Sequence, residues 1–345
     1  MPIIFDAPVA PIDQTEYVRR VPLPSALAFS AAFPTRTVTT NKVNLGEITK
    51  TNRTARYRSF DGRIHVADRD GVASTVIDMM PLSDSRNIGE YERLQIEMAR
   101  LGGTNRQAEI DAIYDDATDL TTYVRNRMEL AIGDVLVDGK FTPFELPGVE
   151  IDYGVPANHL ITVGTSWTTT GTANTLADLI AACDQYEATN GFRPGVAWAP
   201  RQAIRLLQTN TALINAVKGA QTGATRLSLQ DAFNVFDGEG LPTDWRTYET
   251  QLDVDGVSTR VLPTDKIILC PPNLEDLLEI RYGMTATALE LVNSTQVDMS
   301  FQQAAGIVGV VIKDGPPFRQ YTYVDAVGMP ILKDAKKLMV LDVIP

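Results

Sequence analysis

The chain has 345 residues, 44% of them hydrophobic, and a formal net charge of -12 at pH 7. This is enough for one large or two medium domains with a packed core. The negative charge argues against a surface built mainly to hold nucleic-acid phosphates, because such contacts depend on Lys and Arg. The sequence also lacks a run of about 18 apolar residues, which a membrane span needs, and the basic start of a signal peptide.

Residues 1–53 are rich in proline, which disrupts helix interiors and central strands. We therefore expect an extended N-terminal arm. Such an arm stays ordered only when it is docked, so a neighbouring subunit is the expected support, with a disordered tail as the alternative. The prolines of this segment are Pro2, Pro8, Pro11, Pro22, Pro24 and Pro34.

Residues 54–80 alternate between apolar and polar side chains, which is typical of β-strands. The tetrapeptide D-R-D-G at residues 68–71 suits a tight turn between two strands. The sequence thus predicts an extended β-hairpin loop. Because both of its faces are polar, this flap would be marginal alone, and we expect it to be completed on a partner subunit.

Residues 81–165 are expected to form a domain with two helices. The first covers about 87–101, where apolar residues recur at helical spacing before Gly102 and Gly103. The second covers about 105–138 and has no proline. It would be about 50 Å long, which suggests the spine of an elongated molecule. Its apolar stripe contains Ile113, Ala117, Leu120, Val124, Met128, Ala131 and Val135.

Charge is distributed unevenly along the chain. The first 63 residues contain nine Lys or Arg and five Asp or Glu, a net charge of +4, so the remainder carries -16. A row of acids lies opposite the apolar stripe of the long helix, where a simple solvated face is the alternative interpretation. The sharper hypothesis is that basic residues of the arm and flap contact these acids on a neighbouring copy. The inter-subunit candidates are Arg53, Arg56, Arg58, Arg63, Asp111, Asp115 and Asp119.

After residue 139 the sequence contains segments with the apolar spacing of strands and others with that of helices. Residues 166–305 are expected to form a mixed α/β domain, with a helix that stops at Asn190 and Gly191. Residues 306–345 are strand-rich. The predicted fold class is therefore α+β.

No motif of catalysis or cofactor binding is present. The two histidines, His65 and His159, have no companions at metal or triad spacing, and P-loop, zinc and nucleophile-elbow signatures are missing. The D-V-D-G run at 253–256 lacks the later ligands of a calcium loop, so a hairpin turn is favoured. Cys183 and Cys270 lie in apolar runs and are expected to be reduced core residues of a protein made in a reducing cytoplasm. We expect no catalytic residues, no cofactor and no metal.

The order of arm, flap, spine helix, mixed domain and closing strands resembles the Hong Kong 97 capsid fold. This resemblance implies that residues 81–165 are the peripheral domain, that 166–305 are the axial α/β domain, and that the strands of 306–345 return to the peripheral domain. Several stretches resemble the lambda-type E family of tailed-bacteriophage major capsid proteins over nearly the whole chain. The longest are V-R-N-R-M-E-L-A-I-G-D-V-L-V-D-G-K-F (124–141), F-R-P-G-V-A-W-A-P (192–200) and K-D-G-P-P-F-R-Q-Y-T-Y-V-D-A-V-G-M-P-I-L (313–332). Shorter ones are G-T-S-W (164–167) and D-K-I-I-L (265–269).

The resemblance implies a homo-oligomer of pentamers and hexamers in an icosahedral shell, a virion component assembled in the bacterial cytoplasm. It also implies a separate scaffold protein, a portal, sometimes a decoration protein, and double-stranded DNA on the inner face without sequence specificity. Because residues 54–80 contain no lysine, we expect no covalent cross-link of the kind formed in the fold's founding member. The alternatives are a phage-derived compartment shell of the same fold and, more remotely, a cytosolic enzyme.

Overall fold

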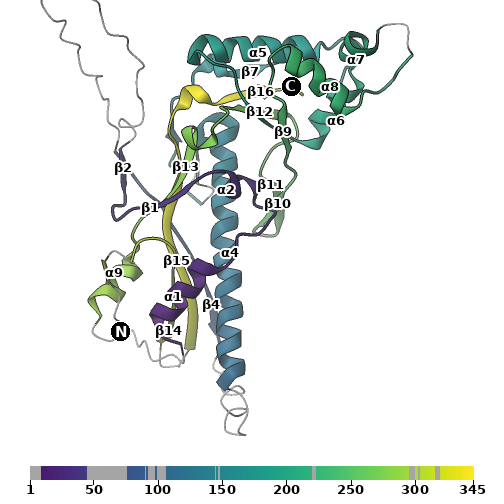
Figure 1. The fold of residues 1–345 in the computed structure, drawn as a ribbon. Coiled ribbons are helices and arrows are strands. Elements are labelled where there is room, and N and C mark those ends of the chain that lie inside the picture. The colour runs from purple at the N-terminus through teal and green to yellow at the C-terminus, as the bar shows by residue number, and fades with distance from the viewer. Residues whose placement is uncertain are drawn as a thin grey trace, which may run out of the picture.

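Helix α4, Arg106–Asp138, runs along the long axis of the molecule (Figure 1). The computed structural model describes residues 9–44, 76–89, 91, 98, 106–143, 145–146, 148–219, 223–294, 300–301, 304–314 and 319–345. The expected spine helix at 105–138 is confirmed. Of the seven residues in its predicted stripe, six are buried and Ala131 is partly buried, because this face packs against the rest of the chain.

Residues 9–44 differ from the extended arm that the prolines predicted. They contain helix α1, Pro11–Arg20, and helix α2, Ala28–Ala32, and both contact α4. Pro11 is the first residue of α1, where no backbone N–H donor is needed, so proline begins this helix instead of preventing it. Phe29 of α2 is fully buried in the chain's own core. This part of the arm is therefore supported by its own chain.

The base of the expected flap is a two-stranded ladder. Strand β2, Lys42–Asn44, pairs antiparallel with β3, Val76–Asp78, so the two ends of segment 45–75 lie side by side. The hairpin therefore begins earlier than the predicted residue 54. Segment 45–75 itself, including the turn predicted at 68–71, lies outside the described residues, and that turn stays a prediction.

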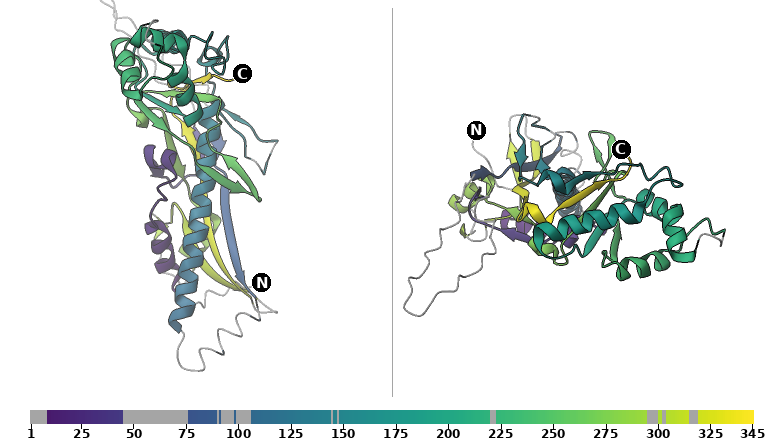
Figure 2. Two further views of the ribbon diagram at one scale, coloured as in Figure 1. Left: turned by 90° about the vertical axis from the view of Figure 1, so that its right-hand side faces the viewer. Right: turned by 90° about the horizontal axis from the view of Figure 1, so that it is seen from above.

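The first sheet is built around the 14-residue strand β15, Arg319–Leu332. Its first part pairs antiparallel with β14, Val308–Asp314, on one side and with β4, Pro81–Ile88, on the other. Its second part pairs with β13, Leu278–Tyr282, and β1, Thr35–Thr37, adds a parallel strand to β13. Helix α4 packs along this β15 sheet (Figure 2).

Strand β4 occupies the beginning of the region predicted to be a helix at 87–101. Asn87 and Ile88 are ladder partners of Tyr321 and Gln320 in β15, so pairing with a distant strand overrides their helical spacing. Within 90–105 the structure describes only Tyr91 and Met98. Both of these residues are helical and exposed, so the rest of that prediction is untested.

The second sheet has the strand order β7-β16-β12-β8-β9. Its central strand β12, Lys266–Cys270, reads K-I-I-L-C and is buried over its last four residues, as expected for a strand covered on both faces. The other strands are β7, Leu160–Thr162; β16, Met339–Asp342; β8, Val196–Ala199; and β9, Asp244–Thr247. The helices of this part are α5, Thr175–Asn190; α6, Arg201–Thr209; α7, Thr211–Lys218; and α8, Leu229–Gly238.

Several local sequence signals determine where these elements begin and end. Helix α5 begins after Asn174, whose side chain accepts from the N–H of Ala177, and stops at Gly191 with φ 77°, as predicted. The predicted turn at 253–256 joins β10, Gln251–Val254, to β11, Val257–Arg260, as an antiparallel hairpin. The smaller elements are β5, Lys140–Phe141; β6, Ile151–Asp152; α9, Ala286–Asn293; and 3-10 turns at Ala157–His159, Leu274–Asp276 and Ala335–Lys337.

The two sheets do not follow the predicted domain boundaries at residues 166 and 305. Strand β7 precedes 166 and β16 belongs to the closing segment, yet both lie in the β12 sheet. Strand β13, inside 166–305, lies in the β15 sheet. The sheets cross the predicted boundaries because strands that are far apart in sequence pair with each other. Among the described helices, none is long and apolar enough to span a bilayer.

Candidate assembly surfaces

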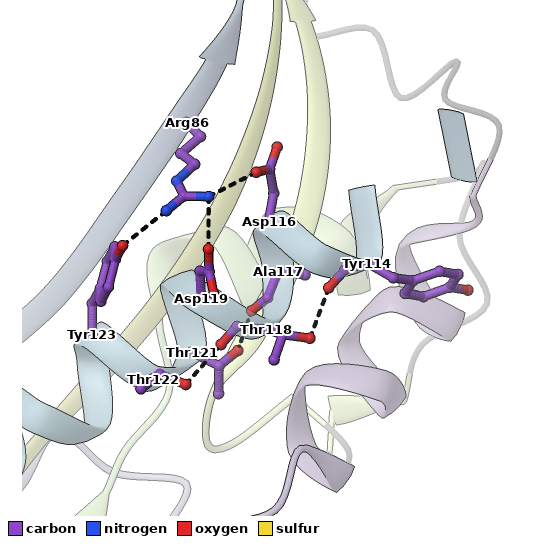
Figure 3. A network of polar contacts seen from close by, with 9 residues as sticks. All are labelled: Arg86, Tyr114, Asp116, Ala117, Thr118, Asp119, Thr121, Thr122 and Tyr123. Atoms are coloured by element: carbon purple, nitrogen blue, oxygen red, sulfur yellow. Dashed lines mark hydrogen bonds and ion pairs between the residues drawn. The ribbon is translucent and has the colours of Figure 1, made fainter. Parts of the chain in front are cut away.

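A network centred on Arg86 ties strand β4 to helix α4 (Figure 3). The Arg86 guanidinium lies 2.9 Å from a carboxylate oxygen of Asp116 and 2.9 Å from one of Asp119, and it donates to the Tyr123 hydroxyl at 2.8 Å. It also sits over the Tyr123 ring at 5.6 Å. The hydrogen bond to Asp116, more than any other contact, raises the pKa of Arg86. The strand that leads out of the flap is therefore fixed to the spine.

This network changes the interpretation of the predicted acidic row. Asp119 already contacts Arg86 of its own chain, and Asp116, which was not among the predicted residues, contacts it as well. Asp115 is exposed, and among the described residues no basic side chain forms an ion pair with it. The side chain of Asp111 lies outside the described residues, as do Arg53, Arg56, Arg58 and Arg63. The structure thus leaves Asp115 as the acid best placed for an outside contact.

An apolar groove of about 1000 Å³ lies beside the spine. Its walls are α4, the start of β4, the loop after β5 and the β10–β11 hairpin. Leu146, Val149 and Val257 in this loop and hairpin are 50%, 39% and 65% exposed. Exposed apolar surface of this kind is a candidate contact surface for another protein. Residues that form its floor include Leu82, Val124, Met128, Ala131, Val137 and Val261.

Charged groups surround this groove. Arg127 of α4 pairs with Glu145 at 2.5 Å, which ties the loop to the helix. The carboxylate of Asp134 accepts a hydrogen bond from the N–H of Thr142 at 2.8 Å. Burial raises the pKa of Asp134. The hydrogen bond from Thr142 lowers it by a smaller amount, so the pKa stays above its ordinary value. An apolar floor with a charged rim is the usual composition of a protein–protein contact.

A second polar cluster, centred on Glu129, was missed by the sequence analysis. Glu129 lies on α4 and is completely buried. Its carboxylate accepts from the N–H groups of Phe29 and Ser30 at 2.8 and 2.7 Å, and from the Tyr248 hydroxyl at 2.5 Å. The only signal in the sequence is an acid beside Met128 in an otherwise apolar helix face. That signal does not identify its partners, which lie about a hundred residues away.

His159, Cys183 and Cys270, for which the sequence suggested no catalytic or metal-binding role, lie in the core, and His65 lies outside the described residues. His159 is buried, with its ring nitrogens 2.9 Å from the carbonyl oxygen of Leu338 and 3.0 Å from the Thr189 hydroxyl. Cys183 and Cys270 are free and buried, and burial raises the pKa of the Cys183 thiol to about 12. The part of the chain that the structure describes contains no group of three His, Cys, Asp or Glu residues able to hold a metal ion.

Comparisons with known proteins agree with this architecture. The structure is similar to that of a protein described as a prophage capsid protein of Escherichia coli CFT073, with 15% identity, a TM-score of 0.62 and coverage of 99% of this chain and 100% of that one. It is also similar to a phage-related protein of Bordetella bronchiseptica RB50, with 12% identity, a TM-score of 0.55 and coverage of 99% and 98%. The chain thus has the Hong Kong 97-type capsid fold.

A family model is matched over most of the sequence. Among curated protein sequences none matches this chain. The model described as phage major capsid protein E matches residues 13–303. This range includes the spine helix, the Arg86 and Glu129 clusters and four of the five strands of the β12 sheet, and it ends before β14, β15 and β16. The chain belongs to the phage major capsid protein E family.

Proposed function

We propose that this capsid shell protein assembles through pentamers and hexamers into the icosahedral head of a tailed phage and has no enzymatic activity. The observation that carries the proposal is the family match over residues 13–303, together with the elongated fold along α4. The exposed apolar groove beside α4 adds a candidate contact surface for a neighbouring subunit.

The proposed partners of the shell are other phage proteins and the packaged DNA. A separate scaffold protein directs assembly in the bacterial cytoplasm, a portal occupies one vertex, and a decoration protein binds outside. Double-stranded DNA fills the shell without sequence-specific contact. The net charge of -12 supports weak rather than extensive phosphate binding. The two buried, reduced cysteines support assembly in a reducing compartment.

We further propose that basic residues of one flap contact the acidic face of a neighbour's spine. Arg53, Arg56, Arg58 and Arg63 supply the positive charges, and Asp111, Asp115 and Asp119 the negative ones. Asp115 is the principal acid, because Asp119 shares its charge with Arg86. Charge pairs of this kind steer association and fix register more than they add affinity.

The assembly proposal is tested on purified protein, co-expressed with a neighbouring scaffold gene, by light scattering and negative-stain microscopy. Closed shells or ring-shaped capsomers are the expected products. A monomer of about 38 kDa under all conditions contradicts the proposal.

The flap contact is tested by charge exchange. Replacing Arg53, Arg56 and Arg58 by alanine should abolish or slow assembly while leaving the monomer folded. Asp115→Arg should have the same effect, and combining it with Arg56→Asp should restore part of the rate. Unchanged assembly in the triple variant would sink this contact while leaving the shell-forming function intact.

A further inference from the structure

Residues 21–30, here called the strap, run from the end of α1 into the first turn of α2 and cross the spine helix. One side of the strap is anchored on α4. Arg125 donates to the carbonyl oxygens of Val21 and Pro22 at 2.6 and 2.9 Å. One helical turn further along α4, Glu129 accepts from the N–H groups of Phe29 and Ser30. The two ends of the strap are thus held by one basic and one acidic side chain of the same helix.

The Glu129 carboxylate also acts as the N-terminal cap of α2. The residue before α2, Leu27, has no side-chain cap, so the first amides of this short helix need an acceptor from elsewhere. Glu129 supplies both oxygens, and the Ser30 hydroxyl donates to one of them. A fully buried carboxylate is tolerated only when its oxygens are satisfied, and here four donors satisfy them.

The other side of the strap is anchored on the segment that leaves the β12 sheet. The Tyr248 hydroxyl donates to Glu129, and burial raises the pKa of Tyr248, which keeps its proton in place. Thr250 donates to the carbonyl oxygen of Ala26 at 2.7 Å. The Phe29 ring lies 5.0 Å from the Trp198 ring of β8 and 4.4 Å from the ring of Tyr248. The strap therefore joins the spine to the β12 sheet.

We propose that Glu129 is a positioning residue that, through the strap, sets the angle between the spine helix and the β12 sheet and so the curvature of the assembled shell. This rests on the proposed shell-forming function. About 23 residues of α4 extend from Glu129 to Arg106, a lever of about 35 Å. A rotation of about 5° at the Glu129 joint moves the far end by about 3 Å. Repeated in every subunit, that displacement changes how many copies close a shell.

The test compares wild-type protein with Glu129→Gln. The glutamine keeps the shape, but its NH2 group cannot accept, so donors on one side of the cluster lose their partner. Hydrogen exchange at one of the two amides, Phe29 or Ser30, should become about tenfold faster or more, since one lost hydrogen bond of about 1.4 kcal/mol corresponds to that factor. Shells of the variant, imaged by electron microscopy, should show a shifted or broadened diameter distribution. Glu16→Gln, an exposed acid paired with Arg20 on α1, is the matched control and should change neither readout.

The outcomes separate the two proposals. Absence of shells from wild-type protein refutes the shell-forming function, and this inference with it. Wild-type diameters in a Glu129→Gln variant whose strap exchanges faster overturn the positioning role alone, as does an unchanged exchange rate. If Glu129→Gln does not fold, Tyr248→Phe and Ser30→Ala each remove one donor and keep the carboxylate. Diameters identical to wild type in both of these variants would equally overturn the inference.

Discussion

Replacing Arg86 by alanine removes the ion pairs and the hydrogen bond by which this side chain of β4 contacts the spine helix. The side chain of Arg86 is 38% exposed, that of Asp116 21% and that of Asp119 53%. An exposed ion pair contributes about 0.2–1 kcal/mol, because water and salt screen it. Two pairs and a hydrogen bond to Tyr123 therefore stabilise the fold by about 1–2 kcal/mol in total. For a chain of this length, about 1.5 kcal/mol corresponds to a decrease in Tm of about 2 °C.

The two acids should contribute unequally. Asp116 is less exposed than Asp119 at the same distance of 2.9 Å from Arg86, so its coupling to Arg86 should be larger. Double-mutant cycles of Arg86→Ala with Asp116→Asn and with Asp119→Asn, measured by urea denaturation, determine both coupling energies. Raising the salt from about 0.05 M to 1 M shortens the Debye length to about 3 Å and should reduce the Asp119 coupling first.

A lysine at position 86 is the matched control, because it keeps the charge but cannot reach two carboxylates and a hydroxyl with one planar group. Arg86→Lys should recover less than half of the loss caused by alanine. Coupling energies near zero for both acids, or a larger coupling for Asp119 than for Asp116, would refute the reasoning from exposure.

Two further predictions concern the groove side of α4. An added Cβ at Gly133 would lie 2.6 Å from the carbonyl oxygen of Val261, so Gly133→Ala should lower the free energy of unfolding by about 1–3 kcal/mol although alanine favours helices by about 1 kcal/mol. Urea denaturation measures this, and a more stable variant would contradict the close approach. Burial raises the pKa of Asp134 because it disfavours the charged carboxylate. The folded state is therefore more stable at low pH, where Asp134 is protonated, and loses this stability as the pH rises through the raised pKa. Asp134→Asn should therefore raise Tm at pH 7, with the gain shrinking as the pH falls through the carboxylate range, whereas a gain independent of pH would count against this cause.

The spine helix was predictable because its signal is local. Thirty-three residues without proline repeat an apolar pattern close to 3.6 residues, and no competing structure satisfies that pattern. The hairpin at 253–256 and the stop at Gly191 were predictable for the same reason, since turn chemistry depends on adjacent residues. In each of these places the residues that determine the structure are neighbours in sequence.

The N-terminal segment and β4 were not predictable in this way. Proline at position 11 is compatible both with the first turn of a helix and with an extended arm. What favours the folded conformation of this segment is the burial of residues such as Phe29 in the core, and that burial depends on distant parts of the chain. Strand β4 has helical spacing at its end, but Tyr321 and Gln320 supply ladder partners more than 230 residues away. Tertiary pairing of this kind overrides local propensity, and one sequence does not reveal it.

The partners of the polar residues on α4 could not be predicted for the same reason, because they too are distant in sequence. The two clusters differ in burial: the Arg86 network is partly exposed, whereas Glu129 is buried. Asp119 was among the predicted acids of the spine, but its partner Arg86 lies on strand β4, which the sequence analysis did not predict. Glu129 was hidden within an apolar face, where it is tolerated only because Phe29, Ser30 and Tyr248 donate to it. Salt should weaken the exposed Arg86 network and leave the buried Glu129 cluster nearly unchanged. Ionic strength should therefore act on the attachment of β4 to the spine, whereas the joint between the spine and the β12 sheet should keep its geometry.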